Sequence, residues 1–288
     1  MKSKLTSKHW ILAKLKRWYI YLVLAIIYIP LIIIVLLSFN HATPKGNIDL
    51  NFGVPTWSNY LDLFKNSDFI NALLNSILLS VVVVPISILL ATVTAFGMWK
   101  ARPYQRQAVN FASQMTIVNP EPITGISLAL LFSSTWVALG FNLGFFTVVL
   151  AHISFCTPYA IVAIYPRMAK MKENQILASY DLGRTRMYTF WKVIVPYLMP
   201  AILSGAAIAL AMSLDDFIIT NLVNGSFQTI GTLIYSTRKG IKAWVVTFGA
   251  LVVLITIAVV IIVGIRKYVL LKKLNKARAI SRTTKGGN

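Results

Sequence analysis

Six long apolar stretches constrain this chain more than any other feature of its sequence. A helix needs about 20 apolar residues to cross a bilayer. Stretches of that length lie at residues 18–39, 69–99, 108–135, 143–166, 197–223 and 243–265. Of the 288 residues 57% are hydrophobic and 12% are charged, and that charged share is about half of what a soluble domain carries. The sequence therefore predicts an all-α polytopic membrane protein with six transmembrane helices, and it excludes an ordinary water-soluble enzyme.

The basic residues are distributed unevenly between the segments that connect these stretches. Of the 28, six precede the first stretch, three lie between the second and third, six lie between the fourth and fifth, and eight follow the last. These segments share one side of the membrane, and they leave five basic residues for the other side. Because Lys and Arg collect in cytoplasmic loops, we expect a multi-pass protein of the cell (plasma) membrane with both termini in the cytoplasm.

The same distribution gives the expected domain bounds and explains the net charge of +20. We expect a basic cytoplasmic N-terminus (1–17), a first transmembrane helix (18–39), an extracytoplasmic loop (40–68), a five-helix core (69–265) and a basic cytoplasmic tail (266–288). The tail directly follows a span and suits the anionic headgroups of membrane lipid. That lipid is the expected partner of the basic charge, and nucleic-acid binding is the disfavoured alternative.

Three of the eight acidic residues, Glu121, Asp215 and Asp216, lie inside predicted spans. A carboxylate in hydrocarbon costs several kcal/mol unless it faces protein, water or a cation. His152 is the only basic or imidazole side chain inside the predicted spans, so internal counter-charges are few. The three acids therefore suggest a path for a positively charged solute.

Asp216 belongs to a stripe of small and polar residues along the fifth stretch. The stripe has helical spacing, and its members are Gly205, Ala209, Ser213, Asp216, Thr220 and Asn224. Small residues let another helix approach closely, and the polar ones can line a wet path. Asp215 lies about 100° around the helix axis, so both acids face one path only if the helix breaks there. Each acid also has a plainer interpretation as a hydrogen-bonded packing residue.

Glu121 lies between Pro120 and Pro122. Proline lacks the backbone donor that a helix needs, so we expect the third stretch to break at this point. A broken helix that carries an ionisable residue is a recurring feature of transporters; a simple kink is the alternative. The remaining candidates for the path are Asn75, Trp136, Phe217 and Tyr235. The aromatic ones offer ring faces to an alkylammonium chain, although such rings also serve as interfacial anchors.

No catalytic signature is present in the sequence. It contains no phosphate-binding loop, no HExxH and no GxSxG. Cys156 is the only cysteine and the three histidines are scattered, so we expect no catalytic residue, no metal site and no cofactor in this chain. His152 is interpreted as a packing residue. If transport is powered, ATP is hydrolysed on another chain.

The segment 167–195 predicts two short helices rather than a linker. Gly183 is a favoured C-terminal stop for the first helix, and Thr185 is a possible N-cap for the second. Such a pair is a docking element for a soluble partner, or alternatively a helix pair that lies on the membrane surface.

This segment carries a family resemblance. The run 177–183, a gap of nine residues and the run 193–196 resemble the EAA loop of membrane subunits of binding-protein-dependent ABC importers. The spacing of Gly183 and Pro196 matches that loop, whereas Leu177 replaces its Glu and Ser179 its second Ala. In the family this loop docks into a groove of the ATPase. The resemblance therefore implies that the coupling residues are Leu177, Ala178, Ser179, Asp181, Gly183, Tyr188, Phe190 and Pro196.

Further runs are similar to the C-type permeases of spermidine/putrescine importers. They lie at residues 75–77, 95–97, 123–128, 213–217, 224–226 and 234–236. The resemblance implies a type I ABC importer permease (MetI-like) fold and polyamine import. It also implies a homologous partner permease in a heterodimer, two ATPase subunits that bind ATP and Mg²⁺, and an extracytoplasmic polyamine-binding protein. The alternatives are an importer permease for another small solute, and a cation-selective carrier or channel.

Overall fold

The computed structural model describes residues 3–237 and 240–285, with side chains at 18–237 and 240–272. Arg238 and Lys239, which were counted above among the basic residues, lie outside the described residues, as do residues 1–2 and 286–288. The helices are α1 (Ser3–Leu37), α2 (Ser58–Leu63), α3 (Ser67–Lys100), α4 (Pro103–Val118), α5 (Glu121–Phe132), α6 (Phe145–Met168), α7 (Glu173–Asp181), α8 (Arg186–Thr189), α9 (Val195–Asp215), α10 (Ile218–Val223), α11 (Ile230–Ser236) and α12 (Ala243–Lys285). Single π-helical turns occupy Ser133–Val137 and Phe190–Ile194.

Five helices are long and apolar enough to cross a membrane. Their apolar portions are Trp18–Leu37, Ser67–Lys100, Phe145–Met168, Arg186–Asp215 and Ala243–Lys272. A sixth span is completed if the bent pair Pro103–Val118 and Glu121–Val137 is counted as one. These segments overlap the six predicted stretches, and the predicted all-α class is confirmed.

The chain forms two compact units. The central unit is Ser67–Ser236, and the terminal unit combines Met1–Asn66 with Thr237–Asn288. The last predicted span thus lies in the same unit as the first one, while the other four spans form the central unit.

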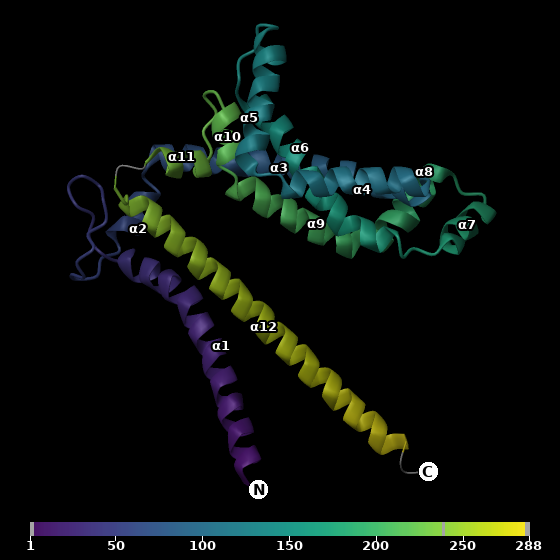
Figure 1. The fold of residues 1–288 in the computed structure, drawn as a ribbon, viewed down its shortest axis with the longest axis horizontal. Helices are drawn as coiled ribbons and strands as arrows, with labels where there is room; N and C mark the ends of the chain where they lie inside the picture. Colours follow the sequence, from purple (N-terminus) through teal and green to yellow (C-terminus); the bar gives the residue numbers. More distant parts are fainter. Residues whose placement is uncertain (1–2, 238–239, 286–288) are drawn as a thin grey trace. The chain divides into compact units, whose positions relative to one another are not determined.

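The predicted break at the prolines lies where the sequence places it. Helix α4 ends at Val118, and α5 begins at Glu121 after a bend of 105°. Asn119 and Pro120 have extended backbones, with ψ of 130° and 134°. The break follows because Pro120 and Pro122 have no N–H to continue the α4 ladder. Figure 1 shows α5 rising away from the direction of α4.

The fifth predicted stretch is not one continuous helix. Helix α9 ends at Asp215, Asp216 is extended with ψ of 128°, and the short helix α10 begins at Ile218. No proline lies between Asp215 and Ile218, so the hydrophobic pattern alone gave no stop signal at this point. The next section describes the side chains that hold this break.

Helices α3, α6 and α9 pack against one another to form the core of the central unit (Figure 1). Small residues allow the close approach, and Ala91, Ala160 and Ala209 are fully buried between the helices. At Gly205 a methyl group would come within 3.3 Å of the Ile88 side chain. In a bilayer helices associate through such close packing, because lipid tails are as apolar as the side chains themselves.

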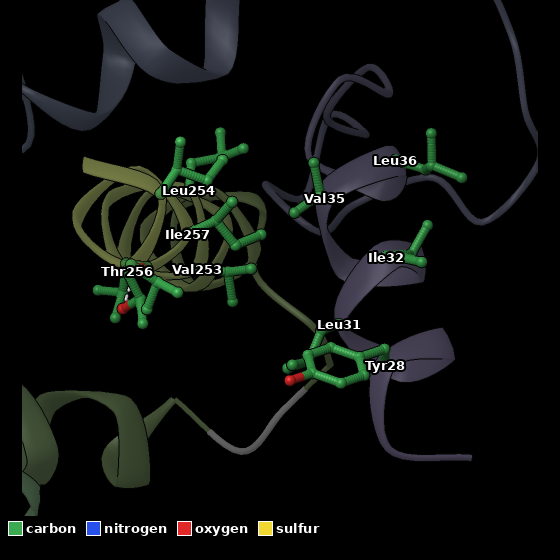
Figure 2. A pocket seen from close by; sticks show the side chains of 12 residues that line it. Tyr28, Leu31, Ile32, Val35, Leu36, Val253, Leu254, Thr256 and Ile257 are labelled. Atoms are coloured by element: carbon green, nitrogen blue, oxygen red, sulfur yellow. Dashed lines mark hydrogen bonds between the residues drawn. The ribbon is translucent and has the colours of Figure 1, made fainter. Parts of the chain in front are cut away.

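The terminal unit pairs α1 with α12 across an apolar groove of about 610 Å³ (Figure 2). The side chains that line the groove are predominantly aliphatic, among them Leu31, Val35 and Val253. The apolar window of α1 has no buried residue, as expected of a helix surrounded by lipid. The loop between α1 and α2 is tied down by Asn59, whose amide donates to the carbonyls of Ser38 (2.9 Å) and Asn40 (2.6 Å).

Gly225, in the turn after α10, is a sensitive position in the central unit. Its φ is +53°, and an added Cβ would collide with the carbonyl oxygen of Leu143. We expect Gly225→Ala to lower the melting temperature of the purified protein by several degrees, because positive φ and the clash together cost about 2 kcal/mol or more.

The matched control is Gly97→Ala. Gly97 lies within α3 and has open space around the position of its missing Cβ. Alanine favours a helix more than glycine does, so the control protein should melt at or above the wild-type temperature. Equal melting temperatures for the two variants would contradict this account of Gly225.

Candidate functional site

The break between α9 and α10 is organised by the carboxylate of Asp216. Its Oδ1 accepts from the backbone N–H of Ile219 (3.2 Å), and its Oδ2 accepts from the N–H (2.9 Å) and hydroxyl (2.7 Å) of Thr220. Asp216 is only 8% exposed. These bonds satisfy backbone donors in the first turn of α10 that have no partner within that helix, so the carboxylate stabilises the break.

Asp215 has a different environment although it is the adjacent residue. It is the last residue of α9, and it is exposed. Next to the break the rings of Phe217 and Tyr235 lie 4.9 Å apart. Helix α11 approaches the break closely at Gly231, where an added Cβ would lie 3.0 Å from the Asp216 carbonyl oxygen. Four of the predicted path residues therefore meet at this one point.

Glu121 joins this group from the other broken helix. It is the first residue of α5, is exposed, and lies close enough to Asp216 and Asp215 for electrostatic repulsion. Helix α5 packs directly on α10, and an added Cβ at Gly125 would lie 2.7 Å from the Leu222 side chain. The bend of α4–α5 and the break of α9–α10 thus lie on helices that pack together, and the three acids flank the two breaks.

The two remaining path candidates lie elsewhere. The Asn75 side-chain amide donates to the Gln228 carbonyl at 2.9 Å, so it fastens α3 to the loop before α11. Trp136 packs against Phe141, with ring centroids 5.3 Å apart. It lies 15 residues beyond Glu121 on the same helical arm, which is about 22 Å along a helix axis.

The stripe of small and polar residues faces the interior of the central unit. Gly205, Ala209, Ser213, Asp216 and Thr220 are all buried, and Asn224 is half-buried. The first three pack toward α3 and α6: Gly205 lies against Ile88 and Ile164, and the Cys156 thiol is 3.7 Å from the Ala209 carbonyl oxygen. In this structure the stripe is a packing face, and the exposed Asp215 lies beside it at the break.

His152 lies next to Asp216 and is buried and hydrogen-bonded, in agreement with the packing role that the sequence indicated. Its ring is fully buried, with Nδ1 at 3.2 Å from the Ser213 hydroxyl and Nε2 at 2.8 Å from the Thr220 hydroxyl. The sequence contained one signal for these hydrogen bonds: His152 is a polar ring in an apolar stretch, and Ser213 and Thr220 lie on the polar stripe of another stretch. A buried imidazole needs hydrogen-bond partners, and those two residues supply them.

The arrangement is suited to meeting a cation. The carboxylates of Asp215 and Glu121 are exposed and that of Asp216 is buried, and the Phe217 ring, which follows Asp216 directly, packs against that of Tyr235. Within the described residues no group of three or more His, Cys, Asp or Glu side chains has the geometry to hold a metal ion. An amine gains from both features, because carboxylates attract its charge and ring faces attract ammonium groups.

The segment that resembles the EAA loop forms the two predicted helices, α7 and α8. Gly183 has a φ of +71° in the turn between them, a conformation that side chains other than glycine adopt at a cost. The Thr185 hydroxyl accepts from the Tyr188 N–H at 3.3 Å, so the predicted N-cap is confirmed. A hydrogen bond of 2.9 Å between the buried hydroxyls of Ser179 and Thr189 joins the two helices.

The predicted coupling residues divide into an outward and an inward set. The exposed side chains are Leu177, Ala178, Asp181, Tyr188 and Pro196. Ser179 lies inside the pair, and the half-buried Phe190 ring lies 5.6 Å from that of Phe96 on α3. Pro196 occupies the first turn of α9. The inward set therefore fixes the shape of the pair and its attachment, while the outward set forms an exposed surface that carries both apolar side chains and the Asp181 carboxylate.

Comparison with known proteins relates the chain to transport proteins. Residues 6–275 match the model of a family described as "Binding-protein-dependent transport system inner membrane component". A Mycoplasma pneumoniae protein named "Spermidine/putrescine transport system permease protein PotC homolog" is 44% identical over 257 residues, which cover 87% of this chain and 90% of that protein. An Escherichia coli protein named "Putrescine transport system permease protein PotI" is 30% identical over 263 residues, 88% of this chain and 89% of that one.

The fold is also similar to that of a solved transporter. The match is to a chain in the crystal structure of a bacterial ABC transporter involved in the import of the acidic polysaccharide alginate, with a TM-score of 0.66 and 17% sequence identity. It covers 89% of this chain and 95% of that chain. At this identity the similarity shows the fold alone, and it confirms the expected type I importer permease architecture.

The family match over nearly the whole chain, the relatives of similar length and the apolar helices agree. The chain is a multi-pass membrane protein that belongs to the family of inner membrane components of binding-protein-dependent transport systems.

Proposed function

We propose that this chain is the membrane-spanning permease subunit of an ATP-driven importer that carries polyamines, spermidine or putrescine, into the cytoplasm. The observation that carries the proposal is the meeting of Asp215, Asp216 and Glu121 at two helix breaks. The names of the relatives that are 44% and 30% identical support the same class of solute.

The acids match the chemistry of a polyamine. A polyamine carries two to four positive charges, and it loses hydration only where anions replace the water. At an effective dielectric constant of 20, unit charges about 4 Å apart attract by ~4 kcal/mol. Asp215 and Glu121 are the exposed acids and make the first contacts, with the pair of Phe217 and Tyr235 beside the alkyl chain. Asp216 contributes its charge from behind, and the sites stay weak enough to release the solute.

The distribution of basic residues gives the orientation. The segments that include both ends of the chain and the α7–α8 pair hold most of the 28 Lys and Arg residues. By the positive-inside rule those segments face the cytoplasm. Asp215, at the far end of α9 from that side, then lies toward the extracytoplasmic half of the membrane.

The partners follow from the resemblance and from the exposed surface of the α7–α8 pair. A homologous permease completes a heterodimer around the path, two ATPase subunits hold ATP and Mg²⁺ beneath it, and a polyamine-binding protein delivers solute from outside. Leu177, Ala178, Asp181 and Tyr188 are the side chains that face the ATPase. ATP binding closes the ATPases and opens the path outward, and hydrolysis returns it to the inward-facing form.

The acids are tested by removing their charge one at a time. We expect Asp215→Asn, Glu121→Gln and Asp216→Asn each to lower polyamine uptake by about tenfold, the effect of losing ~1.4 kcal/mol of attraction on the path. The measurement is uptake of radiolabelled putrescine and spermidine by the complete importer, with membrane insertion and ATPase assembly checked in parallel.

Asp62→Asn is the matched control. Asp62 is an exposed acid in α2 that pairs with Lys65 at 3.5 Å, so its loss should leave uptake unchanged. Normal uptake by all three acid variants would reject the proposed path. Uptake of radiolabelled metal ions or amino acids in place of polyamines would support the importer role of the chain but reject polyamines as its solute.

Coupling to the ATPase is tested at Gly183. We expect Gly183→Val to reduce both ATPase co-purification and uptake, because a β-branched residue at positive φ costs about 2 kcal/mol and reshapes the turn. Gly183→Asn is the control, since asparagine tolerates this conformation, and it should keep most of both activities. Wild-type yield of the ATPase with normal uptake for Gly183→Val would refute the docking role.

A further inference from the structure

His152 is a buried polar group for which the proposed path has no use. It lies in the middle of α6, is fully buried, and is surrounded by three polar side chains. These are the hydroxyl of Ser213 at 3.2 Å from Nδ1, the hydroxyl of Thr220 at 2.8 Å from Nε2, and Oδ2 of Asp216 at 3.6 Å from Nε2. Its own helix adds the Phe155 ring, with centroids 4.9 Å apart.

The direction of these hydrogen bonds follows from the Asp216 carboxylate. Asp216 already accepts from the backbone N–H groups of Ile219 and Thr220. A carboxylate anion is an acceptor only, so the Thr220 hydroxyl donates its single proton to Oδ2 across the 2.7 Å contact. Thr220 must then accept from Nε2–H of His152. In a neutral imidazole this leaves the lone pair on Nδ1, and Nδ1 accepts from the Ser213 hydroxyl.

The hydrogen bonds of His152 bridge the break between α9 and α10. Ser213 lies in the last turn of α9, and Thr220 lies in α10. His152 comes from a third helix and bonds to both, so it joins the two sides of the break. Backbone groups at a helix break in a membrane have no water to pair with, and the geometry there depends on side chains.

The hydrogen-bond network extends to two further helices of the central unit, α3 and α11. The Ser213 hydroxyl is 3.3 Å from that of Ser80 on α3. Because Ser213 donates to Nδ1, Ser80 is the donor in this contact, and it shares its proton between Ser213 and the Ser76 carbonyl at 2.9 Å. The Ser76 hydroxyl accepts from the N–H of Ile230, the first residue of α11, at 2.8 Å. One buried network thus connects α3, α6, α9, α10 and α11 around the break.

From this geometry we infer that His152 is a positioning residue for the transport path. Donating from Nε2 through Thr220, it holds Asp216 inside the bundle and turns the neighbouring Asp215 outward to meet the solute. The inference rests on the proposed function for the solute. It adds a residue that does not touch the solute, and it assigns the proton of the ring to Nε2.

The first test uses the complete importer in proteoliposomes and measures polyamine uptake per ATP hydrolysed. A residue that only packs would change the amount of assembled importer but not this ratio. We expect His152→Phe to lower the ratio by about fivefold to tenfold, the effect of losing one buried donor. His152→Gln should retain most of the ratio because its amide can donate from the place of Nε2, whereas His152→Asn, which mimics Nδ1, should resemble His152→Phe.

Variants of Thr220 test the same hydrogen bond at its acceptor. They keep the inference testable if the His152 variants fail to assemble into the importer. Thr220→Ser keeps the hydroxyl and should retain most of the ratio, whereas Thr220→Val removes it at constant shape and should lower the ratio. Equal ratios for the wild type, His152→Phe and Thr220→Val would overturn the inference. A wild-type importer that carries no polyamine would instead reject the proposed function.

The second test needs no solute. The chain has three histidines, so a chain with His9→Gln and His41→Gln that is labelled with ¹⁵N-histidine and assembled with unlabelled partner subunits reports on His152 alone in the solid-state NMR spectrum of the importer. We expect a neutral ring that is protonated at Nε2 and unprotonated at Nδ1. A proton on Nδ1, alone or with one on Nε2, would overturn the assignment even if polyamine transport is normal.

Discussion

A membrane offers no water to an unpaired backbone group, and the architecture of the central unit depends on how its two helix breaks meet that constraint. At the first break, the carbonyl of Pro120 accepts from the N–H groups of Ile123 (3.0 Å) and Thr124 (3.2 Å). At the second break the chain has no proline, and a carboxylate does the corresponding work by accepting from the first turn of α10. Asp216, whose charge is unfavourable in hydrocarbon, therefore also stabilises the helix break by pairing its backbone donors. The charge of the site and the shape of the backbone thus depend on the same residue.

The fold by itself does not select the charge of the solute. A solved transporter of the same fold takes part in the import of an acidic polysaccharide, whereas this chain brings three acids together inside its spans. The difference must lie in side chains on a shared framework. Here those side chains are placed by packing between α5 and α10, where Gly125 allows the two helices to touch without an intervening side chain. Glu121 and Asp215 are carried on the two interrupted helices, so the spacing of the acids is set by this contact.

The helices could be predicted well from the sequence because the signals for them, hydrophobic stretches and helix-breaking Pro and Gly residues, are local. The apolar stretches, the prolines around Glu121 and the Gly183–Thr185 turn each appear in the structure close to where local rules place them. The end of α9 was harder to predict, since Asp216 stops a helix only through partners in α10 and through His152 on α6. The hydrogen-bond partners of His152 could not be predicted for the same reason: they lie 61 and 68 residues away, and the spacing of a helical stripe does not show which side chains of other helices cover it. Ser179 is a further example, because its departure from the family pattern makes sense only beside Thr189.

The pairing of α1 with α12 has a consequence for how the protein is made. These helices belong to one compact unit, yet about 200 residues separate the end of one from the start of the other. At ~5–20 residues per second of synthesis, α1 waits in the bilayer for about 10–40 s before its partner emerges from the ribosome. During that interval α1 has to remain inserted without its partner helix α12. Its uncharged segment Trp18–Leu37, with a mean hydropathy of 3.1, is stable in lipid without that partner. The central unit has all of its sequence available earlier, so the terminal unit closes last.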